Sequence, residues 1–383
     1  MLKQLKIENF RCFKSFELNH LGRVNLLVGK NNSGKTSVLE AIKLLSSGFD
    51  QSIIFKIMYF RGGYSLNHNV CNIESLFYGH EFDLGTQLKI SCMHNESIRS
   101  IKALVTDTKI IEDNLIRLKR LYSKADELED VDPSEIKKIL DKTLFFREIT
   151  FEDLLHSYKL SKSGDIYDKS LTQEFFLDTD ISMNLIIHGD KDFIGSLFVN
   201  SEMIASSRML DLFDQVVLTP EEQLAYKALQ ILDSRIERIA PVGAEIKSNG
   251  SHGGFYVKLS DSDKRIPIGS MGDGVWRMLG LSLALVAAKD GVLLVDEIDT
   301  GLHYTALEDM WKLIWETAKK LNVQVFATTH SRDCWESMEV LAHRDDVEEE
   351  DISIQRIEKD TPRSVVFNKK GIATAAKREI EVR

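Results

Sequence analysis

Cysteine is scarce in this sequence: only 4 of the 383 residues are cysteine, and no two of them form a C-x-x-C pair. This argues against a zinc knuckle or a disulfide framework, because both need closely spaced cysteines, and it fits a reducing compartment. Long apolar runs are also missing, since none reaches the roughly 18 residues of a membrane-spanning helix. Met1–Leu5 contains no apolar signal-peptide core. We therefore expect a soluble, cytoplasmic protein with no membrane partner.

Positive charge is in the minority, with 49 lysine and arginine residues against 59 aspartate and glutamate residues and a formal net charge of −10. This balance argues against a surface coated with nucleic acid, although it leaves room for one local basic groove. Hydrophobic residues make up 43% of the chain, which is enough for a sizeable buried core.

A strand, a glycine-rich loop and a helix follow one another near the N-terminus. Val24–Val28 is a mostly apolar run of strand length, and residues 33–45 have helical spacing. The segment between them fits the pattern G-x-x-x-x-G-K-[ST], in which backbone N–H groups and a helix N-terminus surround phosphate oxygens. The pattern predicts that Lys35 contacts the β- and γ-phosphates of ATP and that Thr36 offers its hydroxyl to Mg²⁺. The predicted nucleotide-binding residues here are Gly29, Lys30, Asn31, Asn32, Ser33, Gly34, Lys35, Thr36 and Ser37.

Two acidic residues follow a second apolar strand. Val292–Val295 has the composition of a buried parallel strand, and Asp296 at its carboxyl end is placed to hold Mg²⁺ through water. Glu297 would lie beside the γ-phosphate and polarise the attacking water. An apolar strand followed by two acids is by itself more often a plain strand end. Together with the phosphate loop, it predicts an ATPase site.

These motifs occur in the order found in ABC-type ATPases, and the chain resembles those of the RecF, SMC and OLD (overcoming lysogenisation defect) kind. The run from Asp296 to His303 is similar to the Walker B motif and D-loop, although His303 replaces the usual acidic residue. Ala327–Ser331 resembles the switch-histidine loop, which implies that His330 hydrogen-bonds the γ-phosphate. The predicted catalytic residues are Lys35, Glu297 and His330.

Ile268–Gly274 occupies the position of the ABC signature, directly before a predicted helix. Ser270 and Gly272 match the serine and second glycine of the pattern, whereas Met271 replaces the first glycine and Asp273 the glutamine or glutamate. By itself the segment fits an ordinary glycine-rich helix cap equally well. In this family it binds the γ-phosphate held by another subunit. The resemblance therefore implies that Ser270, Gly272 and Asp273 complete a partner copy's site in a head-to-tail homodimer or a higher even-numbered oligomer.

The fold implied by these patterns is α/β: an ABC-type, RecA-like nucleotide-binding domain with a mixed sheet, an antiparallel β subdomain and an inserted helical lobe. Residues 1–70 and 200–383 would form the ATPase head, and residues 71–199 the insertion. Predicted strand arms of the insertion lie within 88–105 and 175–188.

Helices are predicted both in the insertion and in the head. Apolar residues from Ile111 to Leu128 repeat at three and four positions, which is typical of an amphipathic helix. A second helix would start at Asp132-Pro133. In the head, Thr219-Pro220-Glu221-Glu222 has the pattern of a capping box and predicts a helix to about Ile239. The acidic run Asp345–Asp351 is predicted to be a solvated loop.

The two ends of the chain refine the resemblance. Asn9-Phe10-Arg11 is similar to the opening of RecF and OLD proteins, where a strand-borne arginine lies near the nucleotide; Arg11 would also fit an ordinary surface position. OLD nucleases carry a C-terminal TOPRIM domain of about a hundred residues. Only Ser331–Arg383 follow the switch histidine, so we expect an ATPase without a TOPRIM domain. Related ATPases act with a separately encoded effector in antiphage systems, an analogy at the level of fold.

The resemblance implies a switch that binds ATP and Mg²⁺ and loosens on hydrolysis. We favour a sensor or regulator of antiphage defence that controls a separate effector, such as a TOPRIM-type nuclease or a toxin. The alternatives are a RecF-like repair or chromosome-maintenance ATPase that binds DNA, and a scaffold that binds ATP with little turnover. Arg117 and Arg120, off the apolar stripe of the 111–128 helix, could contact a DNA backbone or only solvate the helix. An ABC transporter subunit is a further rival, against which the RecF/OLD opening and His303 argue.

Overall fold

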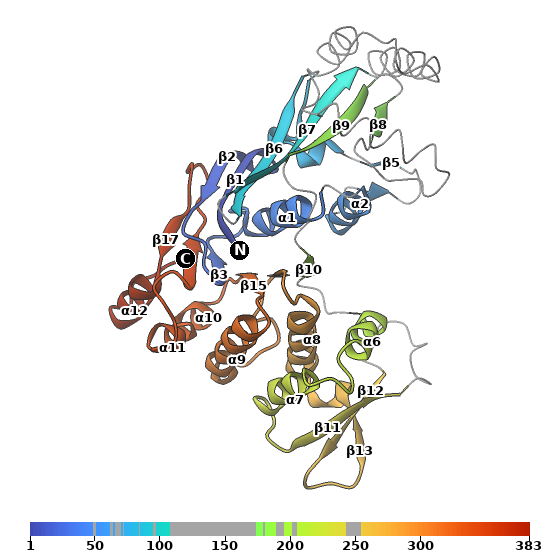
Figure 1. Ribbon diagram of the computed structural model, residues 1–383, viewed down its shortest axis with the longest axis vertical. Helices are drawn as coiled ribbons and strands as arrows, with labels where there is room; N and C mark the ends of the chain where they lie inside the picture. Colours follow the sequence, from blue (N-terminus) through green and yellow to red (C-terminus); the bar gives the residue numbers. More distant parts are fainter. Residues whose placement is uncertain are drawn as a thin grey trace, which may run out of the picture.

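The computed structural model describes residues 1–48, 51–61, 64–65, 70–71, 73–83, 85–94, 97–107, 174–178, 181–188, 195–200, 205–242 and 254–383. In this part of the chain, most strands belong to two six-stranded sheets. Figure 1 shows an antiparallel sheet at the top, a mixed sheet in the centre, and helices with a three-stranded sheet at the bottom. None of the described helices is both long enough and apolar enough to cross a membrane.

The central sheet is parallel except for one edge strand. Its order is β10 (Ser196–Val199), β14 (Val292–Val295), β15 (Gln324–Thr328), β3 (Val24–Val28), β16 (Ile352–Arg356) and β17 (Val365–Phe367). Neighbouring strands are parallel until β17, which is antiparallel to β16. Because β15 lies between β14 and β3, the carboxyl ends of all three meet at one edge, where ligands of such sheets bind.

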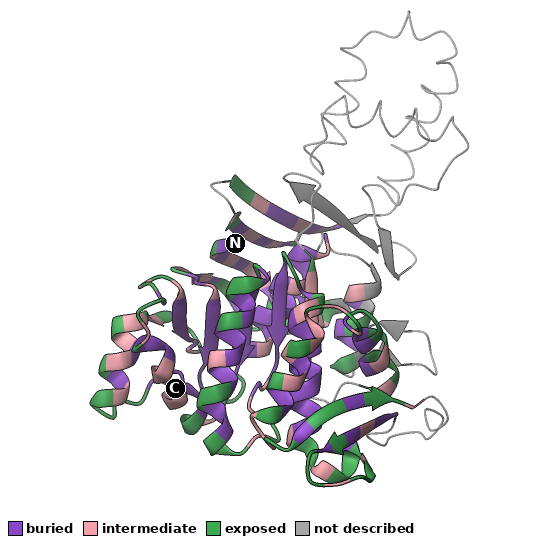
Figure 2. Ribbon diagram, turned by 60° about the horizontal axis from the view of Figure 1, so that its bottom comes forward, coloured by how far each residue is buried: buried purple, intermediate pink, exposed green. Residues whose placement is uncertain are grey.

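Helices cover both faces of the central sheet: α1 (Lys35–Ser46) on one, α8 (Asp273–Ala287) and α9 (Leu307–Lys320) on the other. Side chains of β3 alternate between the two cores. Leu26 and Val28 pack in the core that contains α8 and α9, and Leu27 packs in the core that contains α1. Figure 2 shows the central strands buried between these layers. Burial on both faces explains the nearly continuous apolar runs of the strands.

The antiparallel sheet lies on the far side of α1. Its order is β2 (Phe13–Leu18), β1 (Leu2–Phe10), β6 (Gln87–His94), β7 (Ser97–Asp107), β9 (Ile181–His188) and β8 (Glu174–Asp178). The predicted strand pair within 88–105 is confirmed, and it continues the sheet begun by β1. The predicted helices at 111–128 and after Asp132 lie outside the described residues.

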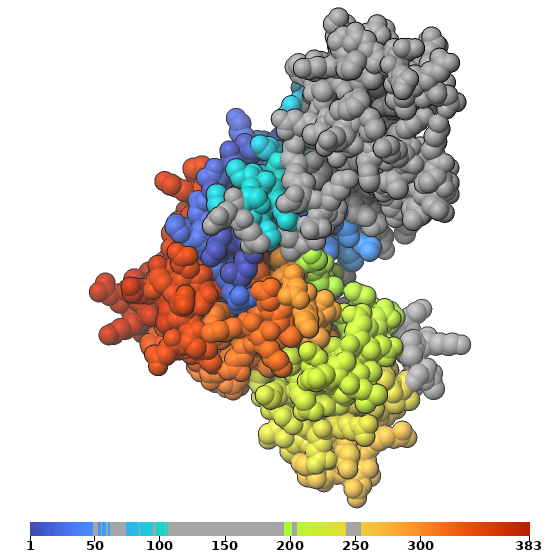
Figure 3. All heavy atoms as spheres, viewed as in Figure 1, coloured from blue at the N-terminus to red at the C-terminus, as the bar shows by residue number. Residues whose placement is uncertain are grey.

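Shorter elements surround these layers. Between the sheets lie α2 (Gln51–Phe60), β4 (Tyr64–Ser65), β5 (Val70–Cys71) and the 3₁₀ turns η1 (Ile73–Leu76) and η2 (Tyr78–His80). The lower region contains α6 (Ser206–Asp214), α7 (Glu222–Gln230), β11 (Ile236–Pro241), β12 (Phe255–Leu259), β13 (Arg265–Pro267) and η4 (Ile268–Met271). In the space-filling view this region projects away from the C-terminal part of the chain (Figure 3).

The helix predicted from the capping box to Ile239 is wrong at both ends. The hydroxyl of Thr219 donates to the carbonyl of Val216 at 2.7 Å instead of capping a helix, and α7 begins at Glu222. The chain then turns, and Ile236 and Ile239 lie in β11. An irregular register between Ile236 and Arg238 lets two residues three apart face the same core. The same spacing is typical of a helix, which explains the error.

The end of the chain contains helices that the sequence analysis did not predict: η5 (Tyr304–Ala306) before α9, then α10 (Arg332–Ser337), α11 (Glu339–Ala342) and α12 (Lys369–Lys377). The side chains of Ser331 and Asn368 cap α10 and α12, accepting from the N–H groups of Cys334 at 3.2 Å and Gly371 at 3.0 Å. These helices are too short to give a clear periodic signal.

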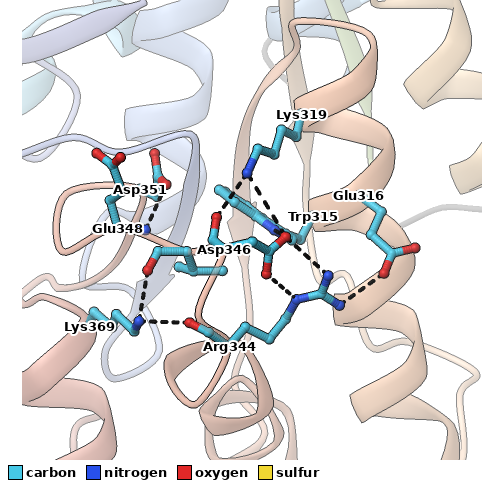
Figure 4. A network of polar contacts seen from close by, with 9 residues as sticks. Trp315, Glu316, Lys319, Arg344, Asp346, Glu348, Asp351 and Lys369 are labelled. Carbon is cyan, nitrogen blue, oxygen red and sulfur yellow. Dashed lines mark hydrogen bonds and ion pairs between the residues drawn. The ribbon is translucent and has the colours of Figure 1, made fainter.

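The acidic run Asp345–Asp351 forms a loop, as predicted, but neighbouring helices hold it in place (Figure 4). Arg344 donates to Asp346 at 2.8 Å and to Glu316 of α9 at 2.9 Å. Lys369 of α12 donates to the carbonyl of Arg344 at 2.8 Å and to that of Val347 at 2.7 Å. The hydrogen bonds from Arg344 lower the pKa of Asp346 to about 2.

Gln324 joins the two large sheets. Its side-chain oxygen accepts from the N–H of Leu2 at 2.7 Å, and its nitrogen donates to the carbonyls of Leu2 at 2.8 Å and Gly22 at 2.7 Å. Leu2 opens β1, whereas Gln324 opens β15. Gln324 is 1% exposed, so no solvent replaces these bonds.

We predict that Gln324→Ala lowers the free energy of unfolding by about 2–4 kcal/mol, because the buried N–H and carbonyl of Leu2 lose their hydrogen bonds to this side chain. Urea denaturation measures the change. Gln215→Ala, at the exposed end of α6, is the matched control and should change stability by less than about 0.5 kcal/mol. A similarly small change in both variants would contradict the role of Gln324.

Candidate functional site

Two glycines of the phosphate loop hold backbone positions that exclude a side chain. Gly29 has a φ of +144°, and a Cβ there would lie 2.3 Å from the carbonyl oxygen of Ile357. Gly34, the N-cap of α1, has a φ of +102°, and a Cβ there would lie 2.4 Å from the ring of Phe13. The loop is therefore enclosed between the end of β16 and the β1–β2 hairpin. The N-terminus of α1 follows directly, as expected for an anion site.

The remaining loop residues divide by exposure. Lys30, Asn31 and Asn32 are exposed, whereas Ser33 and Ser37 are buried. Among the described residues, the hydroxyl of Ser33 is a buried polar group without a hydrogen-bond partner. Buried polar groups are nearly always paired, so this hydroxyl is available to a ligand.

Lys35 is bent over the loop that precedes it. Its Nζ donates to the carbonyls of Gly29 at 2.8 Å and Lys30 at 2.9 Å. Burial lowers the pKa of Lys35 to about 8, and the carboxylates of Asp296 and Glu297 act in the opposite direction. The ammonium group is thus desolvated and within electrostatic reach of both acidic residues.

The two predicted Mg²⁺ ligands are in contact. Oγ1 of Thr36 lies 3.2 Å from each carboxylate oxygen of Asp296, which also accepts from Oγ1 of Thr328 at 2.6 Å. A hydroxyl and a carboxylate are hard oxygen ligands of the kind that Mg²⁺ takes alongside water and substrate phosphates. These residues therefore fit the ion, which when bound would polarise phosphate oxygens. Within the described part of the chain, no cluster of three or more His, Cys, Asp or Glu residues offers a competing site.

Glu297 is oriented by the neighbouring strand. It has a φ of +49°, which is uncommon for a residue with a side chain. Its N–H donates to Oγ1 of Thr328 at 2.8 Å, so one hydroxyl of β15 contacts both acidic residues that follow β14. The sequence analysis included Thr328 in the switch loop but missed this role. The available signal was a threonine at the end of β15, the strand that lies between β14 and β3 in the sheet.

His330 follows β15 and lines the same cavity as the phosphate loop. Its side chain is exposed, and its carbonyl accepts from Arg383 at 2.7 Å. Burial and, next, the charge of Lys35 lower the pKa of the imidazole, while Glu297 and Asp296 oppose the shift. In its neutral form the ring can donate one hydrogen bond and accept another.

The cavity over the loop has a volume of about 800 Å³. It contains residues 32–37 of the loop and α1, together with His330. Sequence reasoning missed several of its lining residues: Arg61, Ser75, Tyr78, Gly79, His80, Lys359 and Asp360. They lie on segments without a recognisable motif, so only the fold brings them to the loop.

Arg11 also lines this cavity, but it lies in the β1–β2 turn with a φ of +54°, not on a strand. Its side chain is 10% exposed, so the surface alternative is wrong. Nε lies 3.2 Å from a carboxylate oxygen of Glu40, and Nη1 donates to the carbonyl of Ser75 at 2.8 Å. Among the described residues, Nη2 is buried and has no hydrogen-bond partner.

The signature residues lie elsewhere. Gly272, with a φ of +93°, is the N-cap of α8, and Ser270 and Asp273 beside it are exposed. The hydroxyl of Ser270 donates to the carbonyl of Pro267 at 2.7 Å. None of the described residues that line the phosphate-loop cavity comes from this segment. A single chain therefore keeps its signature apart from its own loop.

Arg277 connects α8 to the acidic residues. Its guanidinium donates to the carbonyls of Asp296 at 2.8 Å, Glu297 at 2.9 Å and Asn200 at 3.0 Å. It is 5% exposed. The sequence analysis missed Arg277, since an arginine in an apolar helix reveals its partners only through the fold.

We predict that Thr328→Val lowers the rate of phosphate release from ATP by about tenfold or more, because both acidic residues lose the hydroxyl that orients them. Thr328→Ser keeps the hydroxyl and should stay within about threefold of the wild type. Steady-state kinetics with Mg²⁺ measure both, after thermal melting confirms that each variant is folded. Equal rates for the valine and serine variants would contradict an orienting role.

The chain is similar to several known proteins. Residues 24–333 match the family model described as "AAA domain, putative AbiEii toxin, Type IV TA system". An ATP/GTP phosphatase of Helicobacter pylori is 22% identical over 354 residues, 90% of each chain. The DNA replication and repair protein RecF of Clostridioides difficile is 53% identical over 47 residues, which are 12% of this chain and 13% of RecF. An SMC head bound to the C-terminal winged-helix domain of ScpA aligns over 96% of this chain and 97% of that one, with 14% identity and a TM-score of 0.49.

The family match covers most of the chain, from β3 with its phosphate loop to the switch-histidine loop. The chain therefore belongs to this AAA-domain family.

Proposed function

We propose that this protein binds ATP with Mg²⁺ and hydrolyses it at the carboxyl ends of β3, β14 and β15. The phosphate loop and Lys35 bind the phosphates, and Thr36 and Asp296 hold the metal. Glu297 accepts the proton of the attacking water, and His330 contacts the γ-phosphate. The observation that carries this proposal is the contact of Thr36 and Thr328 with Asp296, at 3.2 and 2.6 Å. It brings the separate sequence motifs to one point.

We further propose that two copies join head to tail around two nucleotides. Ser270, Gly272 and Asp273 are exposed at the N-terminus of α8, outside the cavity of their own chain. A helix N-terminus with free backbone donors suits the γ-phosphate bound by another copy. ATP then stabilises the dimer because it contacts both subunits. Loss of the γ-phosphate removes the shared ligand and loosens the pair.

In the cell we assign the protein a cytoplasmic role as the sensor or regulator of an antiphage system with a separate effector, such as a TOPRIM-type nuclease. The family description names a toxin of a toxin–antitoxin system, which supports a function shared between proteins. We divide the chain into a head of residues 1–70 and 200–383 and an inserted lobe of residues 71–199. The lobe continues the sheet of β1, which gives it a mechanical connection to the β1–β2 turn beside the nucleotide cavity.

We predict that Glu297→Gln slows ATP turnover by about 100-fold or more, because the amide no longer accepts the proton of water. With ATP and Mg²⁺, this variant should accumulate as a stable dimer. Size-exclusion chromatography with light scattering measures the mass of the complex. Removing ATP, or adding Lys35→Ala to this variant, should return the monomer.

A second control separates nucleotide binding from dimer formation. Ser270→Arg in the Glu297→Gln chain adds bulk and charge at the exposed signature, and it should abolish the ATP-dependent dimer while leaving ATP bound. A dimer that forms equally with or without ATP would contradict the proposed switch. Unchanged turnover in Glu297→Gln would favour the scaffold alternative.

A DNA-binding function like that of RecF is the second candidate, favoured by the short identity to that protein. It predicts that the purified protein binds duplex DNA with an affinity that falls steeply as salt increases, since phosphate contacts release counterions. Fluorescence anisotropy with and without ATP measures this. The defence role expects no such binding and a co-purifying effector instead.

A further inference from the structure

The cavity over the phosphate loop is lined by Lys35 and by residues of the β1–β2 turn. Cys12 of this turn lies against the start of α1, since a Cβ on Gly34 would be 2.6 Å from its Sγ. In phosphate-loop sites the lysine reaches the β- and γ-phosphates, and the backbone at the start of the helix surrounds the α- and β-phosphates. The base of a bound nucleotide therefore lies toward the β1–β2 turn.

The wall beyond that turn is built by η1 and η2 and is anchored to the core. The backbone N–H of Arg11 donates to the carbonyl of Leu76 at 2.8 Å, and its Nη1 donates to the carbonyl of Ser75 at 2.8 Å. Phe77 is fully buried, with its ring centroid 5.2 Å from that of Phe82. The backbone of the residue after Phe77 is therefore anchored to the core.

That residue is Tyr78, which lines the cavity while 42% exposed. The chain then turns sharply through Gly79, with a φ of +78°, and His80, with a φ of +59°. An added Cβ on Gly79 would have no atom within 4 Å, so the space beside the turn is open. An aromatic ring held at the open wall of an otherwise polar cavity is a surface on which a planar ligand can stack.

We propose that Tyr78 is the stacking platform for the base of the bound nucleoside triphosphate, an inference that rests on the proposed ATP-binding function. Arg11, whose buried Nη2 has no hydrogen-bond partner among the described residues, lines the same cavity as Tyr78 and supports an anionic ligand there. Base stacking on an aromatic side chain needs no hydrogen-bond readout. Tyr78 would thus contribute affinity for the base and none for the phosphates.

The experiment compares a ligand that carries a nucleoside with one that does not: AMP-PNP and inorganic tripolyphosphate, each with Mg²⁺, titrated calorimetrically into the full chain. Tyr78→Ala should weaken AMP-PNP binding by about tenfold and change tripolyphosphate binding by less than about twofold. Tyr78→Phe keeps the ring and should bind both ligands within about twofold of the wild type. Leu218→Ala removes another large exposed side chain (92% exposed), one outside the cavity, and should change neither affinity.

The outcomes separate this inference from the proposed function. Equal weakening of both ligands by Tyr78→Ala, or no weakening of either, would overturn the platform while leaving ATP binding intact. A wild-type chain that binds neither ligand would overturn both. Selective loss of AMP-PNP binding, rescued by phenylalanine, supports the platform.

Discussion

The site is organised around one buried carboxylate, that of Asp296. It lies where three parallel strands end, and it accepts hydrogen bonds from Thr36 behind the phosphate loop and from Thr328 of β15. Each of these hydroxyls is fixed by a different part of the fold, so the position of the carboxylate depends on the register of the whole central sheet. Arg277 adds a third constraint by binding the carbonyl of the same residue. A shift of any one element would therefore displace the acidic pair relative to the loop, and an error of about 1 Å is enough to impair catalysis.

The helix α8 is the element through which distant parts of such a site can influence one another. Its N-terminus carries the exposed signature residues, and one turn later Arg277 binds the backbone of the acidic pair. Gly274 packs so tightly against the D-loop that an added Cβ would lie 2.8 Å from the carbonyl oxygen of Gly301. In the proposed dimer, α8 of one chain would touch the nucleotide of its partner and hold the acids of its own site. The two nucleotide sites of the dimer would therefore be energetically coupled through the α8 helices. Binding at either site would change the affinity of the other by the same factor.

Motifs that depend on local backbone geometry or strand burial could be predicted from the sequence. Residues that reach the site only through tertiary contacts could not. Gly29 and Gly34 were identifiable because only glycine fits their backbone. The strands were identifiable because burial on both faces demands apolar runs. The 219–239 helix failed because an irregular strand register placed Ile236 and Ile239 on one face, imitating helical spacing. Arg277 and the segment from Ser75 to His80 carry no pattern, and only the fold brings them to the site.

Local charge, rather than the charge of the whole chain, explains how an acidic protein can bind a polyanion. The formal net charge is −10, yet among the described residues that line the cavity four are lysine or arginine and only one, Asp360, is acidic. Behind them, Glu40 forms ion pairs with both Arg11 and Arg61, at 3.2 and 2.8 Å. One buried carboxylate thus partners two guanidinium groups and leaves a positive charge uncompensated. Burial lowers the pKa of Arg11, because desolvation disfavours its charged form. A phosphate beside the loop would relieve that cost, and the low dielectric that imposes it would strengthen the attraction.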